Sequence, residues 1–63
     1  MQVGDLVRGT LTEQIGIVLA MKPGLPRTIT SVQVLWTTQG DSIFGPGSKE
    51  WSNEKFLDVL TTA

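Results

Sequence analysis

The sequence predicts an all-β protein, a small five-stranded barrel with a short 3₁₀ turn before its last strand. One reason is the segment Ser31–Trp36, where apolar and polar residues alternate and no Gly or Pro interrupts. This is the pattern of a strand with one face on a core. A second reason is that the other apolar segments are short and lie between stretches of Gly, Pro and polar residues. Closing such a sheet on itself removes the exposed edges that an open sheet would present.

Five segments are predicted strands, and residues 1–60 are predicted to form one domain with a tail over 61–63. Between the last two strands, Ser52–Lys55 has room for one 3₁₀ turn, capped by Ser52 or Asn53. Gly16 falls inside an apolar strand, where glycine marks a bulge or a close backbone approach. The predicted strands are Val3–Arg8 (entered through a turn at Gly4–Asp5), Ile15–Met21, Ser31–Trp36, Lys49–Ser52 and Phe56–Leu60.

The core is expected to centre on the third of these strands. Alternation turns Val32, Val34 and Trp36 inward and leaves Leu35 on the outward face. Trp36 and Trp51 favour packing in the core or at its rim, and an exposed aromatic groove is the alternative. The full predicted core is Val7, Ile17, Val18, Ala20, Val32, Val34, Trp36, Trp51, Phe56, Leu57 and Val59.

The composition excludes several kinds of site. The 63 residues contain no Cys and no His, so no disulfide forms and neither thiolate nor imidazole is present for metal binding or acid–base chemistry. The formal net charge is −1, from five Lys and Arg against six Asp and Glu. That balance lacks the basic excess typical of nucleic-acid binders. We find no pattern of a secretory signal and no apolar run of membrane-spanning length.

No motif in the sequence predicts an enzyme. Gly45–Lys49 superficially resembles a phosphate-binding loop, but Pro46 lacks a backbone N–H donor and no predicted helix follows. The six carboxylates share no motif spacing, and no nucleophile or oxyanion donor accompanies them. We therefore expect no catalytic, cofactor or metal site.

Four segments of the chain resemble small SH3-like barrels: Val3–Arg8, Gly16–Val18, Val32–Trp36 and Phe56–Leu60. A Gly-Asp-x-Val start followed by a Gly-x-Val strand is similar to KOW-type barrels. The placement of the two tryptophans and the Phe-Leu-Asp-Val-Leu ending are more similar to very short barrel proteins encoded by tailed bacteriophages, particularly cyanophages. The resemblance covers most of the chain and implies an SH3-like fold.

The predicted function is that of a non-catalytic structural or adaptor barrel that docks into a protein assembly. Large apolar side chains in Gly- and Pro-rich stretches are costly to expose unless a partner covers them. The alternative for Phe44 is packing back over the open end of the barrel. Together with the outward Leu35, such residues form the predicted partner-binding surface, which consists of Leu25, Leu35, Ile43 and Phe44.

The resemblance to phage proteins implies a minor virion component, such as a capsid decoration, cement or connector protein. Its expected partners are capsid or tail proteins or further copies of the chain, in the virion or the host cytoplasm. One alternative is a KOW-like module that binds RNA or DNA through Arg8, Lys22, Arg27 and Lys49 around an exposed tryptophan. Another is a small accessory subunit that docks on a host complex. No membrane interaction is expected.

Overall fold

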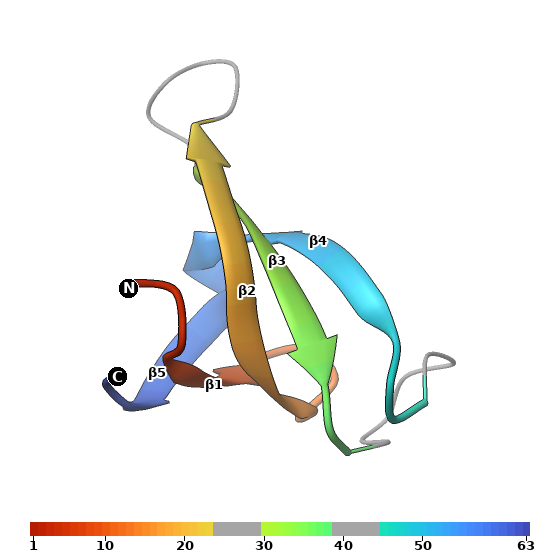
Figure 1. Ribbon diagram of the computed structural model, residues 1–63. Helices are drawn as coiled ribbons and strands as arrows, with labels where there is room; N and C mark the ends of the chain where they lie inside the picture. The colour runs from red at the N-terminus through yellow and green to blue at the C-terminus, as the bar shows by residue number, and fades with distance from the viewer. Residues whose placement is uncertain (24–29, 39–44) are drawn as a thin grey trace.

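The computed structural model describes residues 1–23, 30–38 and 45–63. Within them, five antiparallel strands form one sheet in the order β4-β3-β2-β1-β5 (Figure 1). A 3₁₀ turn, η1, joins β4 to β5. The elements are β1 (Leu6–Gly9), β2 (Ile15–Pro23), β3 (Thr30–Trp36), β4 (Lys49–Asn53), η1 (Glu54–Phe56) and β5 (Leu57–Thr61).

The all-β class, the five strands and the 3₁₀ turn before the last strand are confirmed. Of the two caps that the sequence offered, Asn53 is the one used. Its side-chain oxygen accepts a hydrogen bond from the Lys55 N–H at 3.1 Å. Closure of the sheet into a barrel stays a prediction, since β4 and β5 are the two ends of the strand order.

Seven strand ends differ from the prediction, five of them by a single residue. The first strand begins at Leu6 because a turn precedes it, with Gly4 at a φ of 95°. β2 continues through Pro23 because its last residues pair with the start of β3. Thr61, predicted to lie in the tail, belongs to β5 because it pairs with Leu6.

The core is formed by alternate residues of the sheet. β3 makes the largest contribution, with every second side chain buried as its pattern predicts. The buried cluster consists of Val7, Val18, Val32, Val34, Trp36 and Leu57, with Met21 packed against it.

Four members of the predicted core are exposed, and Ala20 is only partly buried. Ile17 lies between two buried residues of β2, so alternation turns it to the outer face. Trp51 and Val59 belong to β4 and β5, the edge strands of the sheet. Phe56 ends η1, which buries no residue. The core prediction is wrong for these four because an apolar residue at an edge or on an outer face fits the sequence pattern as well as a buried one.

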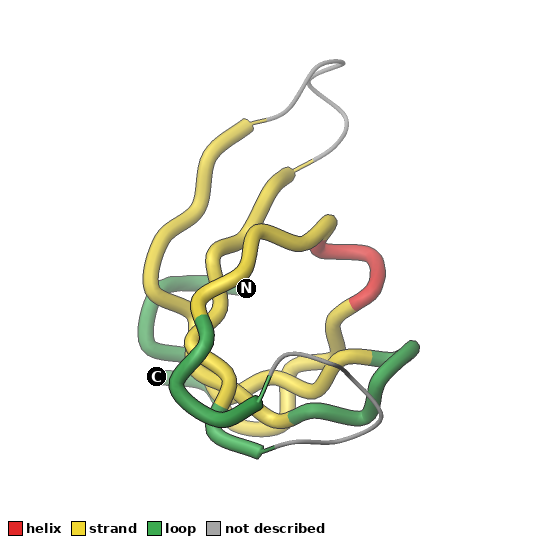
Figure 2. The backbone as a smooth tube through the Cα atoms, turned by 90° about the vertical axis from the view of Figure 1, so that its right-hand side faces the viewer, coloured by secondary structure: helices red, strands yellow, loops and turns green. Residues whose placement is uncertain are grey.

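Gly16 allows β2 and β3 to approach closely, which is one of the two outcomes that the sequence predicts. A Cβ built there would lie 2.5 Å from Val34 Cγ1 and 2.6 Å from the Leu35 carbonyl oxygen. The bulge lies further along β2, where the register with β3 shifts between Val18 and Ala20. Figure 2 shows the strands bending around a common interior.

Asp5 is a buried carboxylate that ties the two terminal segments together. Its Oδ2 accepts a hydrogen bond from the Gln2 N–H and its Oδ1 one from the Ala63 N–H, both at 2.8 Å. Its backbone carbonyl accepts a further bond from the Val18 N–H at 3.0 Å. The amides of Ala63 and Gln2 hold the pKa of Asp5 below its ordinary value of 3.8, because they stabilise the ionised carboxylate.

A lowered pKa in the folded state stabilises the fold while the carboxylate is ionised, so the domain is expected to lose stability as the pH falls below about 4. Asp5→Asn should lower the thermal midpoint by several degrees at neutral pH and flatten this acid dependence. Thermal unfolding followed by circular dichroism from neutral to acid pH measures both effects. The control, Asp58→Asn, removes an exposed carboxylate and should change the neutral-pH midpoint little. An acid dependence as steep in Asp5→Asn as in the wild type would contradict the assignment.

Candidate functional site

An open groove of about 390 Å³ lies beside β4. The β1–β2 connection contributes one wall and residues 50–53 of β4 contribute the other. Trp36 and Leu57, both buried, form its base, and Phe56 lies at the junction of η1 with β5. The groove therefore opens directly onto the core.

The wall formed by the β1–β2 connection is fixed by hydrogen bonds. The Gly9 N–H donates to the Gln14 carbonyl at 2.8 Å, and the Glu13 N–H donates to the Gly9 carbonyl at 2.9 Å. The buried Gln14 side chain adds a third contact, since its Oε1 accepts a bond from Thr12 Oγ1 at 3.0 Å. This loop presents Leu11 to solvent with 74% of its surface exposed.

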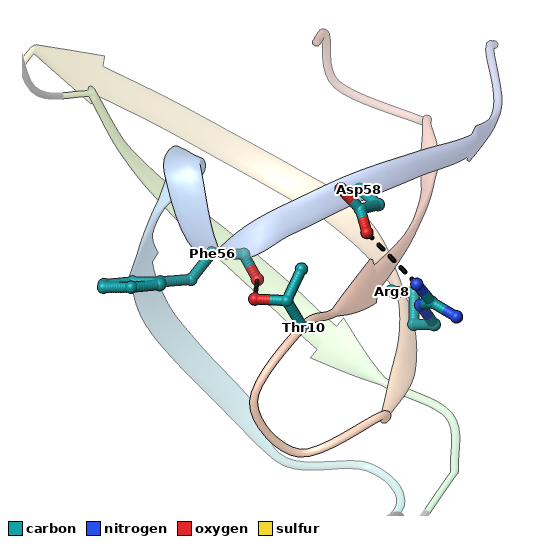
Figure 3. Close-up of polar contacts among 4 residues, drawn as sticks. All are labelled: Arg8, Thr10, Phe56 and Asp58. Carbon is teal, nitrogen blue, oxygen red and sulfur yellow. Dashed lines mark hydrogen bonds and ion pairs between the residues drawn. The ribbon is translucent and has the colours of Figure 1, made fainter.

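Thr10 joins this wall to the η1–β5 junction. Its N–H and its Oγ1 both donate to the Phe56 carbonyl oxygen, at 2.8 and 3.2 Å. Figure 3 shows the Phe56 ring pointing away from this contact and from the Arg8–Asp58 ion pair. The Phe56 backbone is thereby anchored, while the residue as a whole remains 40% exposed.

The groove combines apolar surface with one charged lining residue, and Lys22 and Lys55 place their ammonium groups over the Trp51 and Phe56 rings, at 4.6 and 5.2 Å from the ring centroids. Leu11, Trp51 and Phe56 line it and expose large apolar side chains. Glu50 is partly buried and is the sole charged residue among the described residues that line the groove. Such a surface can bind a ligand that brings both apolar contacts and a positive charge.

The outer face of the sheet carries one residue of the predicted partner-binding surface. Leu35 lies in register with Ile17, which in turn pairs with Leu6, so the three form a row across β1, β2 and β3. Leu35 and Leu6 are partly buried in this row. Four other predicted site residues lie outside the described part of the chain: Leu25, Arg27, Ile43 and Phe44.

Three of the four cations predicted for nucleic-acid binding lie on this outer face. The strand register and side-chain alternation place Arg8, Lys22 and Lys49 on the same side as Trp51. Lys22 Nζ lies 4.6 Å from the centroid of the Trp51 ring, within the range of a cation–π contact. Arg8 is compensated by an ion pair with Asp58, with an N–O distance of 3.2 Å.

Sequence reasoning missed the groove because its residues come from separate parts of the chain. Trp51 and Phe56 were expected in the core, and Glu50 carries no motif. The one available signal is Leu11, a large apolar residue inside the otherwise polar stretch Gly9–Gln14. Because single exposed apolar residues are common on protein surfaces, this signal alone does not identify a site.

Within residues 1–23, 30–38 and 45–63, no three Asp or Glu side chains gather in a way that could hold a metal ion. The same residues include no helix with the length and apolar character to cross a membrane. In comparisons with known proteins, no family model, curated protein or solved structure matches this chain.

Proposed function

We propose that this protein is a non-catalytic adaptor that docks a partner protein in the groove beside β4. The observation that carries the proposal is one groove lined by three residues that expose large apolar side chains: Leu11, Phe56 and, from the outer face, Trp51. Single exposed apolar residues are common on protein surfaces. Several around one concave site are typical of an interaction surface, where aromatic residues are enriched.

The hydrogen bonds of the groove walls also support docking. Thr10 links one wall to Phe56, and the Gly9–Gln14 bond closes the loop that carries Leu11. A surface held in place before binding loses less conformational entropy on association than a mobile one. The domain itself serves as the rigid support.

The setting that we propose is a tailed-phage particle, with this protein as a minor capsid, cement or connector component. The support is the resemblance of the sequence to small phage-encoded barrels. A chain of 63 residues without disulfides has a small core, and binding to a partner would add to its stability. Mass spectrometry of purified particles tests the setting separately from the groove.

A double substitution, Leu11→Ser with Phe56→Ser, tests the groove as the docking surface. Both side chains are exposed, so the variant is expected to keep the far-ultraviolet circular dichroism of the wild type. It should lose its association with the assembly, measured by co-sedimentation. The matched control is Ile17→Ser, at an exposed apolar position on the outer face, which should retain association. Normal co-sedimentation of the double variant, or an equal loss in the control, would refute the proposal.

A second candidate function is nucleic-acid binding on the outer face, and one observation favours it. Trp51 is 46% exposed and has Lys22 over its ring, which is the chemistry of a platform for base stacking. This candidate predicts binding of a single-stranded RNA oligonucleotide that weakens with rising salt and with Trp51→Ala. The absence of a gel shift at low salt would eliminate it.

A further inference from the structure

We propose that the groove binds its partner by strand addition. An extended segment of the partner pairs with the free edge of β4 and places a basic side chain beside Glu50. This inference rests on the proposed function and specifies the chemistry of the partner at the same site.

The edge of β4 offers backbone groups for such pairing. Within the described residues, β4 pairs with β3 alone. The Trp36 N–H donates to the Ser48 carbonyl at 2.9 Å, which fixes the alternation of backbone groups along β4. Glu50 and Ser52 therefore direct their N–H and C=O groups toward β3. Trp51, between them, directs its N–H and C=O away from the sheet.

The groove follows this edge. Four consecutive residues of β4, numbers 50–53, line it. The strand register places the Glu50 side chain on the face toward the core and the Trp51 side chain on the outer face. We infer from lining by residues of both kinds that the groove runs along the edge of the strand. A segment lying in the groove is thus in position to hydrogen-bond with the Trp51 backbone, as strands do when they extend a sheet.

The one charged lining residue of the groove favours a segment that brings a basic side chain to it. Glu50 is the sole charged residue among the described residues that line the groove. The ion pair among the described residues, Arg8–Asp58, lies outside the groove and does not involve Glu50. Glu50 pairs with the buried Val34, so it belongs to the face that leads into the core. A basic side chain from the added segment would compensate this partly buried carboxylate, whereas an acidic one would meet a like charge. Apolar side chains of the segment would contact Leu11 and Phe56.

Three synthetic peptides of about seven residues, a usual strand length, test this inference. The first alternates Val and Thr around a central Lys, the second has Glu in place of the Lys, and the third is the Lys peptide with alternate backbone nitrogens methylated. Nuclear magnetic resonance titration of the ¹⁵N-labelled protein measures affinity and amide exchange. The Lys peptide should bind and slow exchange of the Trp51 amide. The Glu peptide should bind at least about tenfold more weakly, and the methylated peptide should not bind.

Glu50→Gln should weaken binding of the Lys peptide by about threefold to fivefold, the range of a solvent-accessible ion pair. The matched control is Glu54→Gln, which lies outside the groove and should leave the affinity unchanged. Equal binding of the Lys and Glu peptides overturns the assignment to Glu50. Failure of all three peptides to bind, binding of the methylated peptide, or unchanged exchange of the Trp51 amide overturns strand addition. If strand addition fails while the Leu11 and Phe56 double variant still loses co-sedimentation, the groove docks its partner in another way.

Discussion

Gly16→Ala is expected to destabilise the domain by about 2–3 kcal/mol or more, the upper range for overpacking a core. The added methyl group would lie 2.5 Å from Val34 Cγ1, 2.6 Å from the Leu35 carbonyl oxygen and 3.0 Å from Trp36 Cε3. The carbonyl belongs to the neighbouring strand, so it can move only if β2 and β3 separate. A domain of this length has about 3–9 kcal/mol of total stability, and the loss is a large share of it.

Urea unfolding followed by fluorescence measures this loss as a lower midpoint. Gly47→Ala is a suitable control because nothing lies within 4 Å of a Cβ built at Gly47. Gly47 has a φ of 89°, so this substitution tests only the cost of placing a side chain on left-handed backbone. It should lower the free energy of unfolding by about 1–2 kcal/mol. A Gly16→Ala midpoint equal to or above that of Gly47→Ala would mean that the two strands are further apart than the structure shows.

Trp36→Ala is expected to cost about 3–5 kcal/mol, as for other large aromatic residues removed from a core. The indole of Trp36 is 4% exposed and packs on the backbone of two glycines, Gly9 and Gly16. Its removal would leave a cavity at the base of the groove. At the lower end of the stability range, the variant would be largely unfolded in the absence of a partner.

The second tryptophan provides the matched control. Trp51→Ala removes an exposed ring and its contact with Lys22, and should cost no more than about 1 kcal/mol. Each variant also retains one tryptophan as a fluorescent reporter. The remaining Trp36 should emit as a buried indole, and the remaining Trp51 as a solvated one. Comparable losses of stability in the two variants would contradict the different burial of the two rings.

Those two rings also show how far sequence reasoning reaches. Trp36 continues the alternation of β3, and its burial was predicted correctly. Trp51 lies in the short segment Lys49–Asn53, which has no comparable alternation, and its predicted burial is wrong. Ile17 shows the same limit, because its strand is apolar on both faces and the pattern cannot select the inward one.

The sequence predicted less of the candidate site than of the fold. The predicted partner-binding surface depended on apolar residues in loops, and Leu35 is the one member that the structure describes. The groove instead combines Leu11, Glu50 and Phe56. No sequence motif links these residues, because their proximity depends on β4 folding back toward the β1–β2 connection.

The sequence by itself determined the all-β class, the position of β3 with its inward face and the 3₁₀ turn before β5, and at Gly16 it left a bulge and a close backbone approach as alternatives. It also excluded disulfides and any site that needs a thiolate or an imidazole of this chain, since the chain has neither Cys nor His. Period-two alternation shows which residues share a face of a strand, but not whether another element covers that face. Only the tertiary structure decided that β4 is an edge strand, that Trp51 and Phe56 are exposed, and that a groove with one carboxylate lies between them and Leu11.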